Sequence, residues 1–326
     1  MSMVLVLIEH ERGTLVPASL ETLTRARVLA EDLGGRTCGV ILGEAGDPLV
    51  EEVARYGAEH IFQVHHELLG DFGPEAWGES LAQLVGSLQP KVVLGAGTER
   101  GNEVLAQAAA RLNLPLVTNC LKVKAGGNVW EVLRMRWGGS LWERASVNGA
   151  VKLLSLAPNQ EEAIEKDVPV NCEVFLPKLD PVLKRTVVAR RLTLDQGRSL
   201  ATAPVVVSGG RGVRSAEGFA PLEELAELLG GAVGCSRVAT NNGWRPHSDQ
   251  VGQTGTRIAP DIYIACVISG AIKHWVGAMG ARHILAINTD PDANTVSNAD
   301  FAVIGDLHEV VPAIVQAVRE AKGESV

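Results

Sequence analysis

Aromatic residues and cysteines are scarce in this chain of 326 residues. Phe, Trp and Tyr make up 4% of the sequence, which argues against stacking platforms for nucleic-acid bases. The five cysteines are scattered and include no C-x-x-C pair, so neither a disulfide framework nor a zinc site is expected, and a reducing cytoplasm fits. Acidic residues outnumber basic residues by 38 to 30, and the resulting net charge of −8 disfavours nucleic-acid binding.

Long apolar runs are also missing. The N-terminal run covers the six residues from Met3 to Ile8, with no basic region before it and no cleavage site after it, so a signal peptide is not expected. No stretch approaches the roughly 18 apolar residues that span a bilayer, so membrane insertion is not expected either. Because G-x-S-x-G and P-loop motifs are absent, hydrolase and kinase mechanisms have no support, and we predict no catalytic residue.

Short β-branched runs alternate with helical periods through the first third of the chain. This alternation is typical of a parallel sheet with crossover helices. Strands are expected at 3–8, 37–42, 60–64, 91–94 and 116–118, and helices at 20–33, 49–56, 74–88 and 102–112.

The rhythm changes after about Cys120, where Gly-Gly and Asn-Gly dipeptides favour hairpin turns. Antiparallel strands added to the edge of the first sheet are expected at 121–125, 129–135, 144–147 and 151–156. The charged, proline-containing stretch 158–197 is interpreted as the passage between two domains, 1–190 and 191–326.

The α/β alternation restarts in the second domain. Strands are expected at 205–207, 232–233, 262–268, 284–287 and 301–304, and helices at 222–229 and 310–321. In an open α/β sheet the ligand binds at the carboxyl ends of the strands. Small or hydrogen-bonding residues follow all five expected strands, at 208–212, 234–237, 269–274, 288–290 and 305–306.

These strand ends together suit an extended dinucleotide. Small residues let the backbone approach a pyrophosphate, and Arg211, Arg237 and Lys273 supply positive charge. Asn288 and Asp306 suit ribose or ribityl hydroxyls. A separate turn at 250–255 adds donors and two glycines that permit positive φ.

Most of these features also have a purely structural explanation. Gly-Gly after a strand commonly makes a tight turn, and Ser269-Gly270 suits a helix cap. Arg237 alone suits a surface ion pair, His274 alone suits a packing role, and Asp306 alone suits the N-cap of the last helix. The joint pattern favours the ligand site.

Two motifs elsewhere point to other chemistry. The loop 95–101 resembles G-x-G-x-x-G but has one residue too many before its last glycine, which leaves a nicotinamide-dependent dehydrogenase as a minor alternative. His65-His66 suggests a metal, but adjacent side chains on a strand point to opposite faces and no further ligands complete the spacing. No metal site is expected.

The second domain resembles the α subunit of electron transfer flavoprotein in the order and spacing of its motifs over about residues 200–326. The segments that carry the resemblance are 207–212, 231–237, 250–255, 268–274 and 286–291. The first domain matches this family more loosely, in pattern and length. The resemblance implies an N-terminal nucleotide-hydrolase-like parallel sheet with added antiparallel strands, which has lost its own ligand site, and a C-terminal doubly wound FAD-binding domain.

The same resemblance implies one FAD in the second domain. Arg211 is then near the pyrophosphate, and Ser236 and Arg237 are near the phosphate and the ring. Gln253 and Thr254 then face the pyrimidine edge and N5 of the flavin. The cofactor-binding residues implied in this way are Arg211, Gly212, Ser236, Arg237, Gln250, Val251, Gly252, Gln253, Thr254, Ser269, Gly270, Ala271, Ile272, Lys273, His274, Asn288, Asp306 and Leu307.

Within that set, 269–274 would wrap the ribityl chain and pyrophosphate, with His274 close to the flavin O2. Asn288 and Asp306 would hold the adenosine end. Three features depart from the family pattern. Lys273 stands where many relatives have Gln, 292–296 differs from the usual Glu-Ala-Pro-Ile-Phe, and 135–140 replaces a common Tyr-Ala-Gly-Asn pattern.

The family's α chain pairs with a β chain, and the heterodimer carries single electrons rather than acting as an enzyme on its own substrate. Its donors are typically flavoprotein dehydrogenases such as acyl-CoA dehydrogenases, and its acceptor is often a quinone reductase. Such a carrier needs no acid–base triad, because the protein holds the cofactor and tunes it through nearby charge. A non-redox adenine-nucleotide-binding module is the alternative from another functional class.

Overall fold

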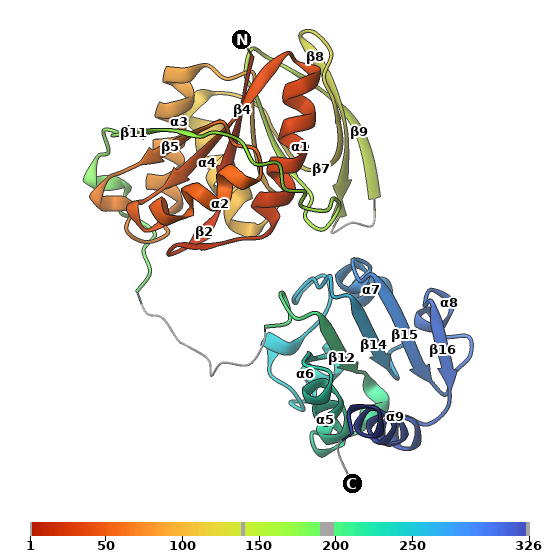
Figure 1. Cartoon of the computed structure of the whole chain (residues 1–326). Coiled ribbons are helices and arrows are strands. Elements are labelled where there is room, and N and C mark those ends of the chain that lie inside the picture. The colour runs from red at the N-terminus through yellow and green to blue at the C-terminus, as the bar shows by residue number, and fades with distance from the viewer. Residues whose placement is uncertain (1, 138–140, 190–198, 324–326) are drawn as a thin grey trace. The chain divides into compact units, whose positions relative to one another are not determined.

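Alternating strands and helices build two separate α/β units (Figure 1). The computed structural model describes residues 2–137, 141–189 and 199–323. The units cover Met1–Arg191 and Leu192–Val326, and each has its own sheet and hydrophobic clusters. The predicted α/β fold class is confirmed, whereas the predicted domain boundary at 190 and 191 lies outside the described residues.

The first unit is built around one large sheet. Its described strands are β1 (Ser2–Ile8), β4 (Gly35–Leu42), β5 (His60–Val64), β6 (Val92–Ala96), β7 (Leu116–Lys124), β8 (Val129–Arg136), β9 (Leu141–Asn148), β10 (Lys152–Leu156) and β11 (Asn171–Phe175). Their spatial order is β11-β5-β4-β1-β6-β10-β7-β8-β9. A small ribbon of β2 (His10–Glu11) and β3 (Thr14–Leu15) stands apart from this sheet. The α-helices are α1 (Ala18–Asp32), α2 (Val50–Arg55), α3 (Pro74–Leu88) and α4 (Glu99–Leu112).

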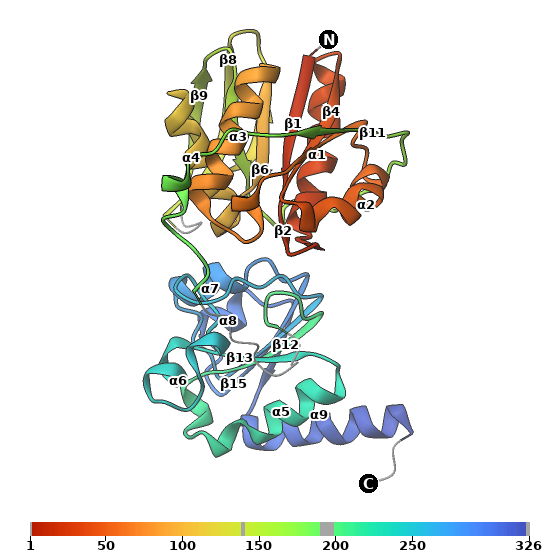
Figure 2. The ribbon, with the colours of Figure 1, turned by 90° about the vertical axis from the view of Figure 1, so that its left-hand side faces the viewer.

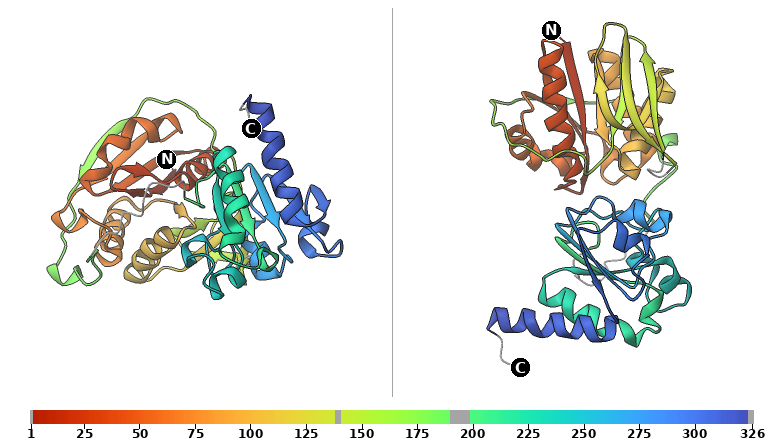
Figure 3. Two further views of the ribbon diagram at one scale, coloured as in Figure 1. Left: turned by 90° about the horizontal axis from the view of Figure 1, so that it is seen from below. Right: turned by 90° about the vertical axis from the view of Figure 1, so that its right-hand side faces the viewer.

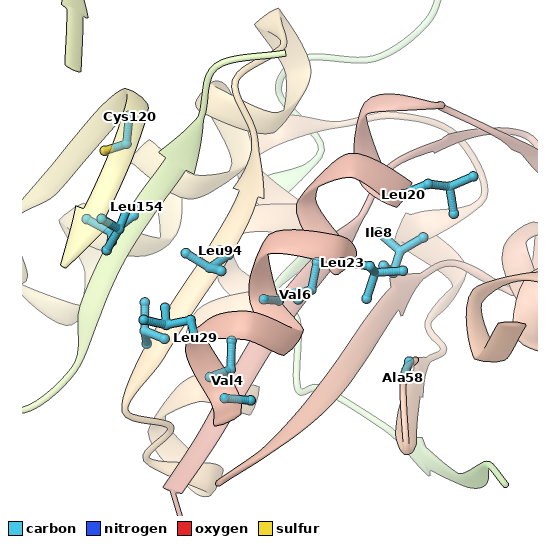
Figure 4. Packing of buried hydrophobic residues seen from close by; sticks show 14 of the residues in the cluster. Val4, Val6, Ile8, Leu20, Leu23, Leu29, Ala58, Leu94, Cys120 and Leu154 are labelled. Carbon is cyan, nitrogen blue, oxygen red and sulfur yellow. The ribbon is translucent and has the colours of Figure 1, made fainter. Parts of the chain in front are cut away.

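Helices cover both faces of this sheet, which explains the continuous apolar runs in its central strands. Val4, Val6 and Ile8 of β1 pack toward α1, while Leu5 and Leu7 pack toward α3 and α4. Figure 2 shows the helices around the sheet, and Figure 4 shows side chains of α1 lying over β1. The core therefore consists of two apolar layers with the sheet between them.

The predicted antiparallel strand at 151–156 is wrong in direction and position. β10 lies between β6 and β7 and is parallel to both, with Leu154 beside Leu94 of β6. Leu153 and Leu154 are completely buried, as expected for a central strand covered on both faces. The stretches 116–118 and 121–125 form the single strand β7, so the antiparallel addition consists of β7, β8 and β9.

β11 lies within the stretch that the sequence assigned to the passage between domains. It pairs in parallel with β5 at one edge of the sheet. Four of its five residues are exposed and the fifth is half-buried, so no buried apolar alternation marks it as a strand.

The described residues contain no arrangement for metal binding or membrane crossing. His65 contacts Asp47 at 3.0 Å between Nε2 and Oδ1, and His66 caps a short turn by accepting from the Leu68 N–H. No group of three or more His, Cys, Asp or Glu side chains in the described ranges is placed to hold a metal. No helix in those ranges combines the length and apolar character needed to cross a membrane. All five cysteines are free thiols.

The second unit is a five-stranded, wholly parallel sheet in its described part. The strands are β12 (Val205–Gly209), β13 (Ala232–Cys235), β14 (Ile262–Cys266), β15 (His283–Asn288) and β16 (Phe301–Ile304). The helices are α5 (Ala220–Leu228), α6 (Arg237–Asn241), α7 (Ile272–Ala278), α8 (Asn294–Ser297) and α9 (Leu307–Lys322). The spatial order is β13-β12-β14-β15-β16, as predicted for a doubly wound sheet.

Helices α5 and α9 lie side by side on one face of this sheet (Figure 3), and α7 contributes to the apolar cluster on the other face. The chain runs from β12 to β13 on one side and then crosses to β14 on the other. This reversal places a topological switch point between β12 and β14 at the carboxyl edge, which is where doubly wound sheets bind their ligands.

Candidate functional site

The loops after β12 and β14 meet closely at the switch point. The N–H of Gly210 donates to the Cys266 carbonyl at 2.9 Å. A Cβ on Gly210 would lie 2.1 Å from the carbonyl oxygen of Val267, so only glycine permits this approach. Because all five strands are parallel, the loops that follow them share one edge of the sheet, and the predicted site residues are brought to that edge.

Three unpaired cations stand above three neighbouring strands. Arg211 follows β12, Arg237 follows β13, and Lys273 lies in the first turn of α7 after β14. All three side chains are exposed, and none forms an ion pair with another described residue. The surface ion pair considered for Arg237 is therefore not seen, and the uncompensated charge suits phosphate groups or an electron-rich ring.

The turn 250–255 is held in place by one buried amide. Gln250 is 2% exposed, accepts from the Thr240 hydroxyl at 3.0 Å and donates to the Thr254 hydroxyl oxygen at 2.9 Å. Because the Thr254 oxygen accepts this bond, its own hydrogen remains available to a ligand. Gln250 thus orients Thr254 as a donor, while Val251, 1% exposed, anchors the turn in the core.

The same turn packs tightly on α7. The N–H of Gln253 donates to the Lys273 carbonyl at 2.7 Å. Gly252 has φ of 145°, and a Cβ on Gly277 would lie 2.3 Å from the Gly252 Cα. The glycines at 252 and 277 are required by this contact within the protein.

Besides Ser208 Oγ within β12, two buried polar atoms at this edge have no hydrogen bond of regular geometry with a described residue: Ser236 Oγ and His274 Nδ1. Ser236 occupies the N-cap position of α6 but makes no capping bond with its side chain. His274 is 8% exposed, and burial lowers its pKa to about 4, so its ring is neutral near pH 7. Since buried polar atoms are nearly always paired, these two atoms fit a site that a polar ligand completes.

Two buried thiols, Cys235 and Cys266, end the two strands that flank β12. Burial raises the pKa of Cys235 and of Cys266 to about 12. Both therefore remain protonated at neutral pH and supply no thiolate nucleophile.

Other predicted site residues already have partners within the chain. Asn288 donates to the Ile268 carbonyl at 3.1 Å and accepts from the Asp290 N–H at 3.1 Å. Asp306 caps α9 by accepting from the His308 N–H at 2.9 Å, as its structural explanation predicts. Leu307 is completely buried in the core. Asn288 and Asp306 therefore use polar atoms to hold the loops at this edge.

The loop 268–272 leads into α7 without the predicted cap. Ala271, not Ser269, is the N-cap residue, and Ser269 is exposed. Gly270 has φ of 76°, and a Cβ there would lie 2.4 Å from the backbone nitrogen of Thr295. The Gly270 Cβ position therefore faces α8, and a branched side chain there would disturb the loop by pushing on α8.

The loop 95–101 in the first unit lies against a carboxylate of the same unit. Glu9 follows β1, and its carboxylate accepts a hydrogen bond from the hydroxyl of Thr98, the N-cap residue of α4. Burial raises the pKa of Glu9. A helix N-terminus at this position would otherwise suit a phosphate, so the internal carboxylate disfavours the nicotinamide alternative.

Sequence reasoning missed several residues behind the site. They are Thr240, which holds Gln250; Tyr263, which contacts His274; Gly277, which admits the turn; and Thr295, which donates to the Ile268 carbonyl. One signal was present for Tyr263, because a hydroxyl within an otherwise apolar strand requires a buried partner.

Comparisons with known proteins agree with this geometry. Residues 4–175 match the family described as electron transfer flavoprotein domain, and residues 199–279 match the electron transfer flavoprotein FAD-binding domain. The electron transfer flavoprotein subunit alpha of Bacillus subtilis is 34% identical over 323 residues, covering 97% of each chain. That of Mycobacterium leprae is 36% identical over 329 residues, covering 99% of this chain and 100% of the relative.

Among solved structures, the crystal structure of Acinetobacter baumannii MurG covers 99% of this chain and 91% of its own, with a TM-score of 0.30 and 13% identity, and supports no argument. The family matches fall on both units, and the FAD-binding match covers the unpaired cations, Ser236 and His274. Together, the two-unit fold, the polar carboxyl edge and the matches along nearly the whole length show that this chain belongs to the electron transfer flavoprotein family, among its alpha subunits.

Proposed function

We propose that the carboxyl edge of the second unit holds FAD between the loops after β12, β13 and β14, and that the chain works there as the α subunit of an electron carrier. The observation that carries this placement is that Ser236 Oγ and His274 Nδ1 are buried without a regular hydrogen-bond partner among the described residues, beside three cations that form no ion pair with those residues. A ligand with both negative charge and hydrogen-bonding groups matches that combination.

The positively charged side chains lie at one end of the carboxyl edge and the neutral or acidic ones at the other. Arg211, Arg237 and Lys273 stand over β12, β13 and β14, which suits the diphosphate and the ring. Asn288 ends β15, and Asp306 ends the loop between β16 and α9, which suits the adenosine end. This polarity gives the dinucleotide one orientation along the edge.

Bound FAD supplies the capacity to accept and release electrons one at a time. The residues of this chain tune that capacity without taking part in bond making. The positive charge of Arg237 favours added negative charge on the ring, and the free hydroxyl hydrogen of Thr254 can bond a ring nitrogen. His274 is neutral, so it acts as a hydrogen-bond donor rather than as a charge.

The partners follow from the family, and exposed apolar side chains support an interface. We propose pairing with an electron transfer flavoprotein β subunit, electron donation by flavoprotein dehydrogenases such as acyl-CoA dehydrogenases, and a quinone reductase or similar acceptor, in the cytoplasm. Ile272, beside the site, is 71% exposed, and Phe301 on the edge strand β16 is 65% exposed. Apolar side chains in such positions commonly mark surfaces that another chain covers.

Co-purification tests this function directly. We expect the chain produced with its β partner to contain one FAD per heterodimer, with visible flavin absorption, and the chain produced alone to be poor in flavin. The reason is that Arg211, Arg237 and Lys273 stand exposed at this edge, where we propose that the β chain supplies the other side of the site. A fully flavinated monomer would contradict the shared site, and a complex that carries AMP or ATP without flavin absorption would contradict the redox function.

A further inference from the structure

The Thr240 hydroxyl has two acceptors within reach but only one hydrogen. Its Oγ1 is 2.9 Å from the carbonyl oxygen of Arg237 in α6 and 3.0 Å from Oε1 of Gln250. A hydroxyl donates one hydrogen bond and accepts up to two. When Thr240 donates to the Arg237 carbonyl, its oxygen is therefore free to accept a hydrogen bond from Gln250.

The side-chain amide of Gln250 fits between its two neighbours in either direction. Its oxygen faces Thr240, and its nitrogen is 2.9 Å from the Thr254 hydroxyl oxygen. A half-turn about the last side-chain bond exchanges the oxygen and the NH₂ group of an amide, which occupy nearly the same positions. The NH₂ group then donates to Thr240, and the Thr254 hydroxyl donates to the amide oxygen. Gln250 is 2% exposed, so these two hydroxyls rather than water supply its partners.

The direction of the amide decides what Thr254 offers to a ligand. With the NH₂ group toward Thr254, the hydroxyl oxygen accepts and its hydrogen is available. With the NH₂ group toward Thr240, the Thr254 hydrogen bonds Gln250 and only lone pairs remain. The second direction makes one more hydrogen bond within the chain, because Thr240 then also donates to the Arg237 carbonyl. An acceptor atom of a ligand at Thr254 offsets that difference, since it gains a bond in the first direction and is left unpaired in the second.

We propose that Thr240 is a positioning residue that lets the Gln250 amide reverse, so that Thr254 donates to an acceptor atom of FAD and accepts from the same atom once it carries a hydrogen. This inference rests on the proposed function, in which the Thr254 hydroxyl bonds a ring nitrogen. N5 of the oxidised flavin ring has a lone pair, whereas N5 of the fully reduced ring carries a hydrogen. A reversible amide at Gln250 keeps a hydrogen bond at Thr254 in both states of the cofactor.

The heterodimer loaded with 5-deaza-FAD, in which C–H replaces N5, separates hydrogen bonding from reduction. Nuclear Overhauser contacts between ¹⁵N-labelled glutamine amides and ¹³C-labelled threonine methyl groups read the direction of Gln250. With oxidised FAD we expect the Gln250 NH₂ hydrogens to contact the Thr254 methyl group, and with 5-deaza-FAD to contact the Thr240 methyl group instead. Gln250→Met identifies the signals by their loss. Gln316, whose NH₂ group donates to the Glu320 carboxylate at 3.0 Å, is the internal control and should not change.

Thr240→Val tests the role of Thr240 itself. Without this hydroxyl, each direction of the Gln250 amide keeps a single bond in the 5-deaza-FAD complex, so the NH₂ group should divide between both sides there. With FAD it should still face Thr254, because the ring nitrogen favours that direction. Thr240→Ser keeps the hydroxyl and should restore the complete reversal. A role of Thr240 in packing alone would not make the two cofactors differ in this way.

A Gln250 NH₂ group that faces the same neighbour with both cofactors would overturn the proposal, and so would complete reversal in Thr240→Val. If Thr240→Val does not fold, Thr240→Ala removes the same hydroxyl with less bulk and carries the same expectation. Absence of FAD from the parent complex would contradict the proposed function instead. An unchanged amide in a heterodimer that binds both cofactors would contradict this inference alone.

Discussion

Gly277→Ala is expected to remove most of the bound FAD, although it adds a single methyl group. The new Cβ would lie 2.3 Å from the Cα and 2.4 Å from the nitrogen of Gly252. Both neighbours are backbone atoms, so the turn 250–255 must move away from α7. Overpacking of this kind costs about 1–3 kcal/mol, and the movement carries Gln253 and Thr254 away from the edge where we place the cofactor.

Gly86→Ala is the matched control for this variant. Gly86 also lies within a helix, α3 in the first unit, and a Cβ there would meet no atom within 4 Å. Alanine is favoured over glycine inside helices by roughly 0.5–1 kcal/mol, so Gly86→Ala should be as stable as the parent or more stable, with unchanged FAD. The two variants are compared by their FAD content per heterodimer, measured from absorbance after purification. Full FAD content in Gly277→Ala would mean that the turn 250–255 does not hold the cofactor.

Arg237→Ala is expected to lower the potential at which bound FAD takes its first electron by tens of millivolts. The Arg237 side chain forms no ion pair with another described residue, so its charge is not neutralised within the chain. A loss of about 1.4 kcal/mol in stabilisation of the reduced ring corresponds to roughly 60 mV for a one-electron couple. His274→Ala should shift the potential in the same direction by less, because the His274 ring is neutral.

Stepwise reductive titration followed by absorbance measures this effect. Arg282→Ala is the control, because Arg282 is also exposed but precedes β15 at the opposite edge of the sheet. Lys273→Gln, alone and combined with Arg237→Ala, separates the contribution of the second cation. An unchanged potential in Arg237→Ala would contradict the placement of Arg237 beside the flavin ring and would leave phosphate binding as its role.

The second unit was largely predictable from the sequence. Its five strands are parallel and end in loops of small or polar residues, so the strand ends alone indicated the ligand edge. In the first unit, the place of β10 was not predictable in this way. Its neighbours β6 and β7 precede it by many residues, and a run buried on both faces contains no alternation that reveals its direction.

The sequence predicted which residues lie at the site, but not which of them face a ligand and which hydrogen-bond within the chain. Arg211, Arg237 and Lys273 stand exposed and unpaired at the expected edge. Asp306 instead caps α9, and Asn288 hydrogen-bonds to the Ile268 carbonyl in a neighbouring loop. The same residue types serve caps and ligands equally well, so sequence spacing cannot separate the two roles.

Hydrogen exchange of the heterodimer with and without FAD tests most directly whether the carboxyl edge of the second unit holds the cofactor. Removing FAD should speed exchange in the segments 208–212, 234–237, 250–255 and 268–274, and should leave the loop 95–101 of the first unit unchanged. Faster exchange confined to 95–101, with no change in the four segments of the second unit, would contradict the placement of FAD at this edge.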